Sequence, residues 1–254
     1  MPELLISIWI VAAVFFVVAL VYSSVGLGGG SSYTALLVIF GFSTLSIPLI
    51  SLSLNILVTT IGSYQFIRHR HVRLRLIAPF ILSSIPMAYL GGTLQIPRQG
   101  FQWILLVSLI VVIYRIYFLK TTAFHLQISD SGKLIISLIA GAILGLVAGI
   151  VGIGGGVYLV PLILVLGLGT VKEAAACGAV FVWLNSVAGL SSRLQFNSVD
   201  FLPYAPLAIA VILGGGLGSY LGSSHYSAQK VEKILGIIVL IAAVFLVRAL
   251  LFTV

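Results

Sequence analysis

Ten apolar stretches divide the chain, and each of them ends at charged residues, glycine or proline. Most approach the roughly 20 residues that a helix needs to cross the roughly 30 Å of hydrocarbon in a bilayer. Because the bilayer core offers no water to the backbone, such a stretch must pair its own N–H and C=O groups, as a helix does. We therefore predict an all-α integral membrane protein with about 8–10 hydrophobic helical segments. The stretches cover residues 4–24, 31–42, 46–67, 76–96, 101–119, 133–151, 156–168, 173–193, 203–223 and 231–252.

The composition excludes a water-soluble surface. Of the 254 residues, 61% are hydrophobic and 7% are charged, whereas soluble domains carry about 25% charged residues. The formal net charge of +8, from 13 Lys and Arg against 5 Asp and Glu, would suggest nucleic acid in a soluble protein. In a membrane protein it reflects basic residues that collect in cytoplasmic loops. We therefore expect membrane lipids and no nucleic acid as partners.

A glycine cluster occurs twice at equivalent places in the chain. The sequence VGLGGG at 25–30 recurs as VGIGGG at 151–156, 126 residues later, with five of six positions identical. Corresponding glycine interruptions in two halves are typical of transporters built from internal repeats. The sequence thus predicts a first repeat over 1–125 and a second over 126–254, fused into one transmembrane domain.

The charges indicate that the two repeats have inverted topology in the cell (inner) membrane. Each half makes an odd number of passes if its glycine hairpin dips in and returns, or if both hairpin arms cross; a hairpin counted as one crossing would give parallel halves. With the basic run 68–75 in the cytoplasm, inversion puts ten Lys and Arg inside, three outside, and both termini outside, as the positive-inside rule favours. The inside set is Arg68, Arg70, Arg73, Arg75, Arg115, Lys120, Lys133, Lys172, Lys230 and Lys233, and the outside set is Arg98, Arg193 and Arg248.

The short stretches 31–42 and 156–168 each follow a glycine cluster. A helix that begins at such a break presents free N–H groups and the positive end of its dipole, which together favour an anion. The alternative is a tight re-entrant turn in which glycine serves only sterically. The candidate substrate-binding residues are the glycines of both clusters and two in-segment amides: Gly26, Gly28, Gly29, Gly30, Asn55, Gly152, Gly154, Gly155, Gly156 and Asn185.

Asn55 and Asn185 lie 130 residues apart, each inside an apolar stretch. A buried amide must form hydrogen bonds, and its NH2 group can donate to an anion without adding charge; the alternative is a bond between helices. Other polar residues near the hairpins or segment ends are candidate accessory contacts. Their alternative roles are local caps, interfacial polar groups or, for Arg193, a side chain that snorkels to the interface. The accessory set is Ser31, Ser32, Tyr33, Tyr158, Gln65, Gln195 and Arg193.

The chain has few carboxylates and no evident catalytic or metal-binding set, which limits the classes of function it can have. No nucleophile, base and acid form an arrangement typical of an enzyme, and no Cys, His, Asp and Glu spacing fits a closed metal site. We therefore expect neither an enzyme nor a metal or cofactor. Na+ sites and proton relays usually show a carboxylate inside the membrane. The five carboxylates all fall away from the middle of the stretches: Glu3, Asp130, Glu173, Asp200 and Glu232.

Small residues four apart predict helices that pack closely, because they let two backbones approach each other in lipid. We expect this packing, and no ligand contact, from the glycine series. The series are Gly141, Gly145, Gly149 in one stretch and Gly214, Gly218, Gly222 in another.

Taken together, these features resemble the TauE/SafE sulfite exporter family. The resemblance rests on VGLGGG near the N-terminus, on GIVGIGGGVYLVP at 149–161, on an in-segment Asn after each, and on the length and hydrophobicity of the chain. It implies transport of sulfur-containing or organic anions such as sulfite, sulfoacetate and other sulfonates, with the hairpin glycines, Asn55 and Asn185 as site residues. One departure is that Ser31-Ser32-Tyr33-Thr34 follows the first cluster without an equivalent of Pro161.

We therefore expect a secondary transporter of a small anion that works by alternating access. A passive anion channel would use the same residues without alternating access and is one alternative. A cation or drug–proton antiporter is the other, and it requires an ionisable group inside a segment.

Overall fold

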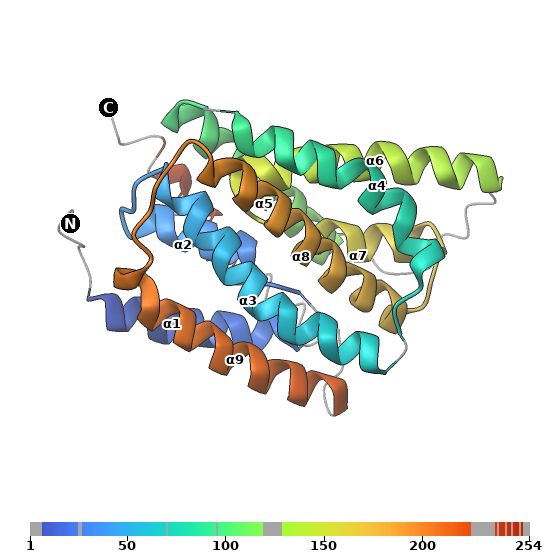
Figure 1. Cartoon of the computed structure of the whole chain (residues 1–254), viewed down its shortest axis with the longest axis horizontal. Coiled ribbons are helices and arrows are strands. Elements are labelled where there is room, and N and C mark those ends of the chain that lie inside the picture. Colours follow the sequence, from blue (N-terminus) through green and yellow to red (C-terminus); the bar gives the residue numbers. More distant parts are fainter. Residues whose placement is uncertain are drawn as a thin grey trace.

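The computed structural model describes residues 7–24, 27–69, 71–94, 96–118 and 129–224, with parts of 237–250 (Figure 1). Within these residues the protein is all-helical, without strands. In chain order the helices are α1 (Ile8–Ser23), α2 (Gly30–Ile39), α3 (Ser46–Arg68), α4 (Leu74–Thr93), α5 (Arg98–Phe118), α6 (Asp130–Val151), α7 (Gly156–Val165), α8 (Val171–Leu194), the short 3-10 helix η1 (Leu202–Tyr204) and α9 (Ala205–Ser224).

The prediction of an all-α, multi-pass membrane protein is confirmed. The first nine predicted stretches each contain one α-helix, and their bounds differ from the observed ones by at most four residues. The tenth, 231–252, falls largely outside the described residues. Among the described residues, five helical stretches are long and apolar enough to cross a membrane: Ser46–Arg68, Leu74–Thr93, Asp130–Val151, Val171–Leu194 and Leu202–Leu221.

Two helices are too short to cross. Helices α2 and α7 have 10 residues each, which at about 1.5 Å per residue gives roughly 15 Å, half of the hydrocarbon thickness. The glycines at their N-termini, Gly28–Gly30 and Gly154–Gly156, are buried, so both glycine turns lie in the interior of the bundle.

The helices form three layers, which Figure 1 shows from the side. Helices α1 and α9 pack together as one layer, α4 and α6 form the opposite layer, and α3 and α8 lie between them. Helix α2 packs on α3, and α7 packs on α8. Each short helix is thus held against a central helix of its own half.

Glycine determines how closely the outer pairs approach. A Cβ on Gly141, Gly145 or Gly149 of α6 would collide with a backbone carbonyl of α4, and a Cβ on Gly214 or Gly218 of α9 would collide with one of α1. The predicted packing role of these five glycines is confirmed. The surroundings of the sixth glycine, Gly222, lie outside what the structure describes.

Contacts between loops fix which helix ends lie together. At one end of the bundle, Arg73 in the α3–α4 loop forms an ion pair of 3.3 Å with Glu173 at the start of α8. Glu173 also completes a capping box with Thr170, which explains why α8 begins there. At the other end, the rings of Phe42, before α3, and Tyr204, before α9, lie 6.0 Å apart. Helices α3 and α8 are therefore antiparallel.

Candidate functional site

Helices α2 and α7 begin in the same way, each behind a glycine with left-handed backbone geometry. Gly29 caps α2 with φ of 93°, and Gly155 caps α7 with φ of 79°. Residues with a side chain rarely adopt this geometry. Gly152, which ends α6, and Gly154 also have positive φ. The duplicated clusters therefore form two sharp helix-to-helix turns.

The two turns meet in the interior. A Cβ on Gly30 would lie 2.7 Å from the carbonyl oxygen of Ile153, and a Cβ on Gly156 would lie 3.5 Å from Leu27. The Ser51 hydroxyl of α3 lies 2.9 Å from the carbonyl oxygen of Gly152 and 3.3 Å from that of Gly30. Segments more than 100 residues apart are thereby joined by one hydroxyl group.

Asn55 lies one helical turn after Ser51 and is fully buried. Its Nδ2 donates to the carbonyl oxygen of Gly152 at 3.4 Å, and no described residue donates to its Oδ1. A Cβ on Gly28 would lie 2.8 Å from that oxygen, and one on Gly154 would lie 3.3 Å from Nδ2. The structure thus brings Asn55 together with predicted glycines of both clusters.

Asn185 is also fully buried, but its contacts differ from those of Asn55. Its Nδ2 donates to the carbonyl oxygen of Phe181 in its own helix at 2.8 Å, and its Oδ1 has no partner among the described residues. The neighbouring Ser186 hydroxyl is what faces the second turn, 3.2 Å from where a Cβ on Gly154 would lie. The two amides therefore do not form a symmetric pair.

The first N–H groups of both short helices are available. No described residue accepts a hydrogen bond from the backbone N–H of Gly30, Ser31, Gly156 or Val157. Such groups, with the positive ends of two helix dipoles, are suited to hold an anion. Glycine here lets other side chains approach the backbone closely: an added Cβ on Gly30 would collide with the Asn55 amide, and one on Gly156 with Val182.

The accessory residues lie in several places. The Ser31 and Ser32 hydroxyls bond to the Tyr22 hydroxyl at 3.0 and 2.8 Å. Tyr33 stacks on Phe15 with ring centroids 4.9 Å apart, and its hydroxyl has no partner among the described residues. These serines and Tyr33 belong to the buried surroundings of the first turn.

The remaining accessory residues lie further out. The Tyr158 hydroxyl donates to the carbonyl oxygen of Ser108 at 2.9 Å, which ties α7 to α5. Gln195 donates to the Tyr89 hydroxyl at 2.7 Å on an exposed surface, and Gln65 is partly buried near the end of α3. The candidate Gly26 lies outside the described residues.

Arg193 is buried, with 8% of its surface exposed. Its Nε and Nη2 donate to the carbonyl oxygen of Gly149 at 3.3 and 2.9 Å, and Nη2 also donates to that of Ile150 at 2.6 Å. The guanidinium therefore caps the C-terminal end of α6, just before the second turn, instead of reaching the membrane interface.

Ser51 and Ser186 were not among the candidates from the sequence. Each carried a signal that could have found it: Ser51 precedes Asn55 by four residues and Ser186 directly follows Asn185. Residues four apart share a helix face, so a buried hydroxyl at that spacing is expected beside a buried amide. Thr34, whose hydroxyl donates to Ser51 at 2.9 Å, carried no such signal.

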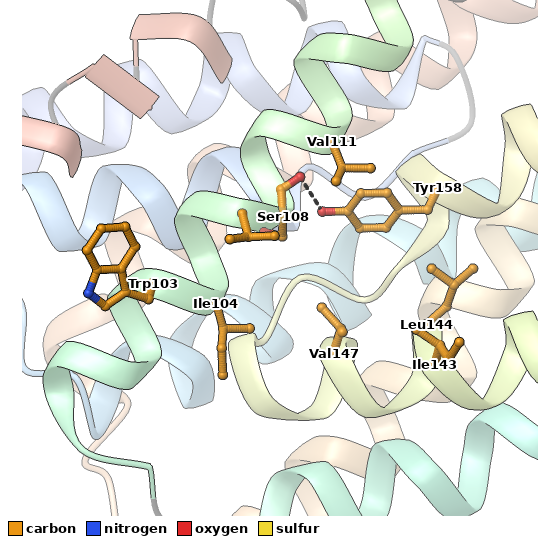
Figure 2. A pocket seen from close by; sticks show the side chains of 9 residues that line it. Trp103, Ile104, Ser108, Val111, Ile143, Leu144, Val147 and Tyr158 are labelled. Atoms are coloured by element: carbon orange, nitrogen blue, oxygen red, sulfur yellow. Dashed lines mark hydrogen bonds between the residues drawn. The ribbon is translucent and has the colours of Figure 1, made fainter.

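A separate cavity of about 380 Å³ lies between α5, α6 and α7 (Figure 2). Its walls are apolar apart from Ser108 and the Tyr158 ring, and Trp103, Val107 and Ile143 on its rim are at least half exposed. A charged solute gains nothing from such walls. This cavity is therefore not the candidate anion site.

Comparison with known proteins identifies the family of the chain. The chain is 36% identical over 237 residues to the probable membrane transporter protein y4hK of Sinorhizobium fredii, with 91% of this chain and 94% of that protein covered. It is 28% identical over 224 residues to the probable membrane transporter protein MJ0441 of Methanocaldococcus jannaschii, with 83% and 82% covered. No solved structure matches the chain. The sequence profile of the family described as sulfite exporter TauE/SafE matches residues 11–246. The chain therefore belongs to the TauE/SafE family, a family of membrane transporters and not of enzymes.

Proposed function

We propose that the protein is a secondary carrier of a small anion, sulfur-containing or organic and similar to sulfite or a sulfonate, that works by alternating access. One observation carries the proposal: the N-termini of α2 and α7 begin at glycine turns that meet beside buried Asn55, and their first N–H groups have no acceptor among the described residues. Two helix dipoles directed at one place favour negative charge. The substrate class follows the family's description, sulfite exporter.

The packing of the helices supports inverted repeats over 1–125 and 126–254. Under this proposal α1 corresponds to α6 and α4 to α9. In each outer layer the first long helix of one repeat then packs against the fourth-position helix of the other repeat: α1 against α9, and α6 against α4. Such exchange is expected of two halves related by a two-fold axis.

The loop contacts support an axis in the membrane plane. The α3–α4 loop lies with the start of α8, as the Arg73–Glu173 ion pair requires. Its counterpart, the connection from α8 to α9, lies with the start of α3, as the Phe42–Tyr204 contact requires. Equivalent loops thus occupy opposite ends of α3, which is expected for inverted repeats.

The basic loop 68–75 then faces the cytoplasm of the cell (inner) membrane, and both termini lie outside. The positive-inside rule supports this orientation. It is tested by tagging each terminus and probing the tags with a protease in intact cells and in inverted vesicles.

Counterflow in proteoliposomes tests the mechanism. Vesicles loaded with unlabelled sulfite or a small alkyl sulfonate are diluted into the same labelled anion. A carrier accumulates label transiently and saturates, because each cycle exchanges one bound anion. A channel equilibrates without overshoot, so a flux without counterflow contradicts the carrier.

A further inference from the structure

Helix α8 carries a buried polar face that begins at the second turn and continues away from it. Ser186, Gly189 and Arg193 follow one another at intervals of three and four residues, which places them on one side of the helix. Ser192 lies beside Arg193 and is fully buried. The Ser186 and Ser192 hydroxyls have no hydrogen-bond partner among the described residues. Most buried polar atoms in folded proteins are paired. Ser192 Oγ packs against Gly92 of α4, so this side of α8 is closed in the present structure, and its unpaired hydroxyls become available to a ligand only when α4 and α8 separate.

Arg193 gives this face its charge. No described carboxylate lies within 4 Å of its guanidinium, since the described ion pairs join other residues. Carbonyl oxygens at the end of α6 accept from Nε and Nη2, but no described residue accepts from Nη1. A buried charge inside a membrane protein is costly and usually functional. The cap on α6 uses only Nε and Nη2 of Arg193 and leaves Nη1 for another contact.

Helix α3 carries the matching face without the charge. An offset of 130 residues pairs Asn55 with Asn185 and Ser63 with Arg193. Ser63 is buried, and its hydroxyl has no partner among the described residues. Because α3 and α8 are antiparallel, the two faces leave the glycine turns toward opposite ends of the bundle. The half beside α8 therefore contains a buried charge, whereas the half beside α3 contains none before Arg68, where the basic loop begins.

We propose that these two faces are the two halves of the substrate path, and that Arg193 selects anions in the half that leads to the 195–202 end. This inference rests on the proposed function, because it needs an anion that passes the glycine turns. Arg193 attracts the anion through Nη1 while its other nitrogens hold the end of α6. Ser63, the counterpart of Arg193 on α3, is uncharged and does not distinguish anions from cations. The selection by a buried charge is therefore made only in the half beside α8.

Thiol labelling of variants that each carry one introduced cysteine tests the inference in the detergent-purified protein. The unmodified chain is the blank, because its one cysteine, Cys177, is buried. Ser192→Cys and Ser63→Cys are each reacted with methanethiosulfonates of similar size that carry either a sulfonate or a trimethylammonium group. The rate ratio is divided by the ratio for a free thiol. We expect Ser192→Cys to favour the sulfonate reagent by about tenfold, since the fixed charge lies on the adjacent residue. The ratio at Ser63→Cys stays near that of the free thiol.

Two further variants separate charge from structure. In Ser192→Cys/Arg193→Gln the preference disappears, because glutamine can donate to the α6 carbonyls but carries no charge. In Ser192→Cys/Arg193→Lys the preference returns. An unchanged ratio in the glutamine variant, no return in the lysine variant, or no reaction at either cysteine overturns the inference.

This outcome is independent of the proposed function. If wild-type protein is stabilised by a small anion but the labelling ratio does not depend on Arg193, the selection is wrong and the site at the turns stands. If no anion stabilises the wild-type protein, the proposed function fails whatever the labelling shows.

Discussion

The Ser51 hydroxyl lies 2.9 Å from the carbonyl oxygen of Gly152, 101 residues away in the sequence. Ser51 belongs to α3, in the first half of the chain, and Gly152 ends α6, in the second. The same hydroxyl lies 3.3 Å from the carbonyl oxygen of Gly30 at the first turn. The register between the two turns therefore depends on a side chain outside both glycine clusters.

Replacing Ser51 with alanine is expected to lower the free energy of unfolding by about 1–2 kcal/mol, because the Gly152 carbonyl oxygen loses its shorter hydrogen bond and the buried Thr34 hydroxyl loses its acceptor. The matched control is Ser53→Ala, whose hydroxyl bonds only to the Leu49 carbonyl within the same helix. Thermal unfolding in detergent measures both. Equal loss of stability in the two variants contradicts a bridging role for Ser51.

Replacing Gly29 or Gly155 with valine is expected to abolish transport while protein remains in the membrane. The side chain strains a left-handed residue and collides with the ring of Tyr33 or Phe181 beside the turn, which displaces the turn. Gly41→Val and Gly167→Val are the controls, because these glycines also have positive φ but no atom lies within 4 Å of an added Cβ. All four variants carry a similar backbone strain of about 1–2 kcal/mol, but only the site variants also meet the Tyr33 or Phe181 ring. Uptake in proteoliposomes is therefore compared at equal amounts of folded protein, measured by thermal unfolding. Wild-type uptake by both site variants rules out the turns as the binding site.

Replacing Asn55 with aspartate is expected to remove anion binding, because a carboxylate in a dry site repels the substrate. Asn185→Asp is expected to weaken binding less, since the Asn185 amide bonds within its own helix. Anion-dependent stabilisation of the purified variants gives the comparison. If Asn185→Asp is the more damaging change, the second half supplies the main amide contact.

Replacing Thr170 with alanine is expected to cost about 1 kcal/mol, because it removes the cap of α8. Arg73→Ala breaks an ion pair whose arginine side chain is 56% exposed, and exposed pairs contribute about 0–1 kcal/mol. Thermal unfolding at low and high salt distinguishes the two losses of stability, because salt screens the Arg73–Glu173 ion pair and does not affect the Thr170 cap. A salt-dependent loss in Thr170→Ala would contradict the capping account.

The helices were predictable because apolar length and glycine position are local properties. The break before α7 follows directly from Gly154 and Gly155, and the end of α3 follows from the arginines beginning at Arg68. The packing glycines of α6 were likewise visible as a spacing of four residues. Each of these depends on neighbours within one segment.

The site was predictable only in part, because its contacts cross the bundle. Asn55 was expected as a buried amide, but its bond to Gly152 depends on how α3 lies against α6. Matching positions suggested that Asn185 would act in the same way, yet it bonds to Phe181 in its own helix. The sequence favoured snorkelling for Arg193, because nothing local indicated that the end of α6 lies within its reach.

The central claim is that the two glycine turns bind a small anion, and a thermal-shift series on the detergent-purified protein tests it most directly. Sulfite, thiosulfate, small sulfonates and carboxylates are compared with chloride and a neutral sugar at matched ionic strength. An anion at 100 times its Kd should stabilise the folded state by about 2.7 kcal/mol. We predict selective stabilisation by one small anion in the wild-type protein and in Gly41→Val, and none in Gly29→Val. Failure of every anion to stabilise the wild-type protein, or equal stabilisation of Gly29→Val, would contradict the claim.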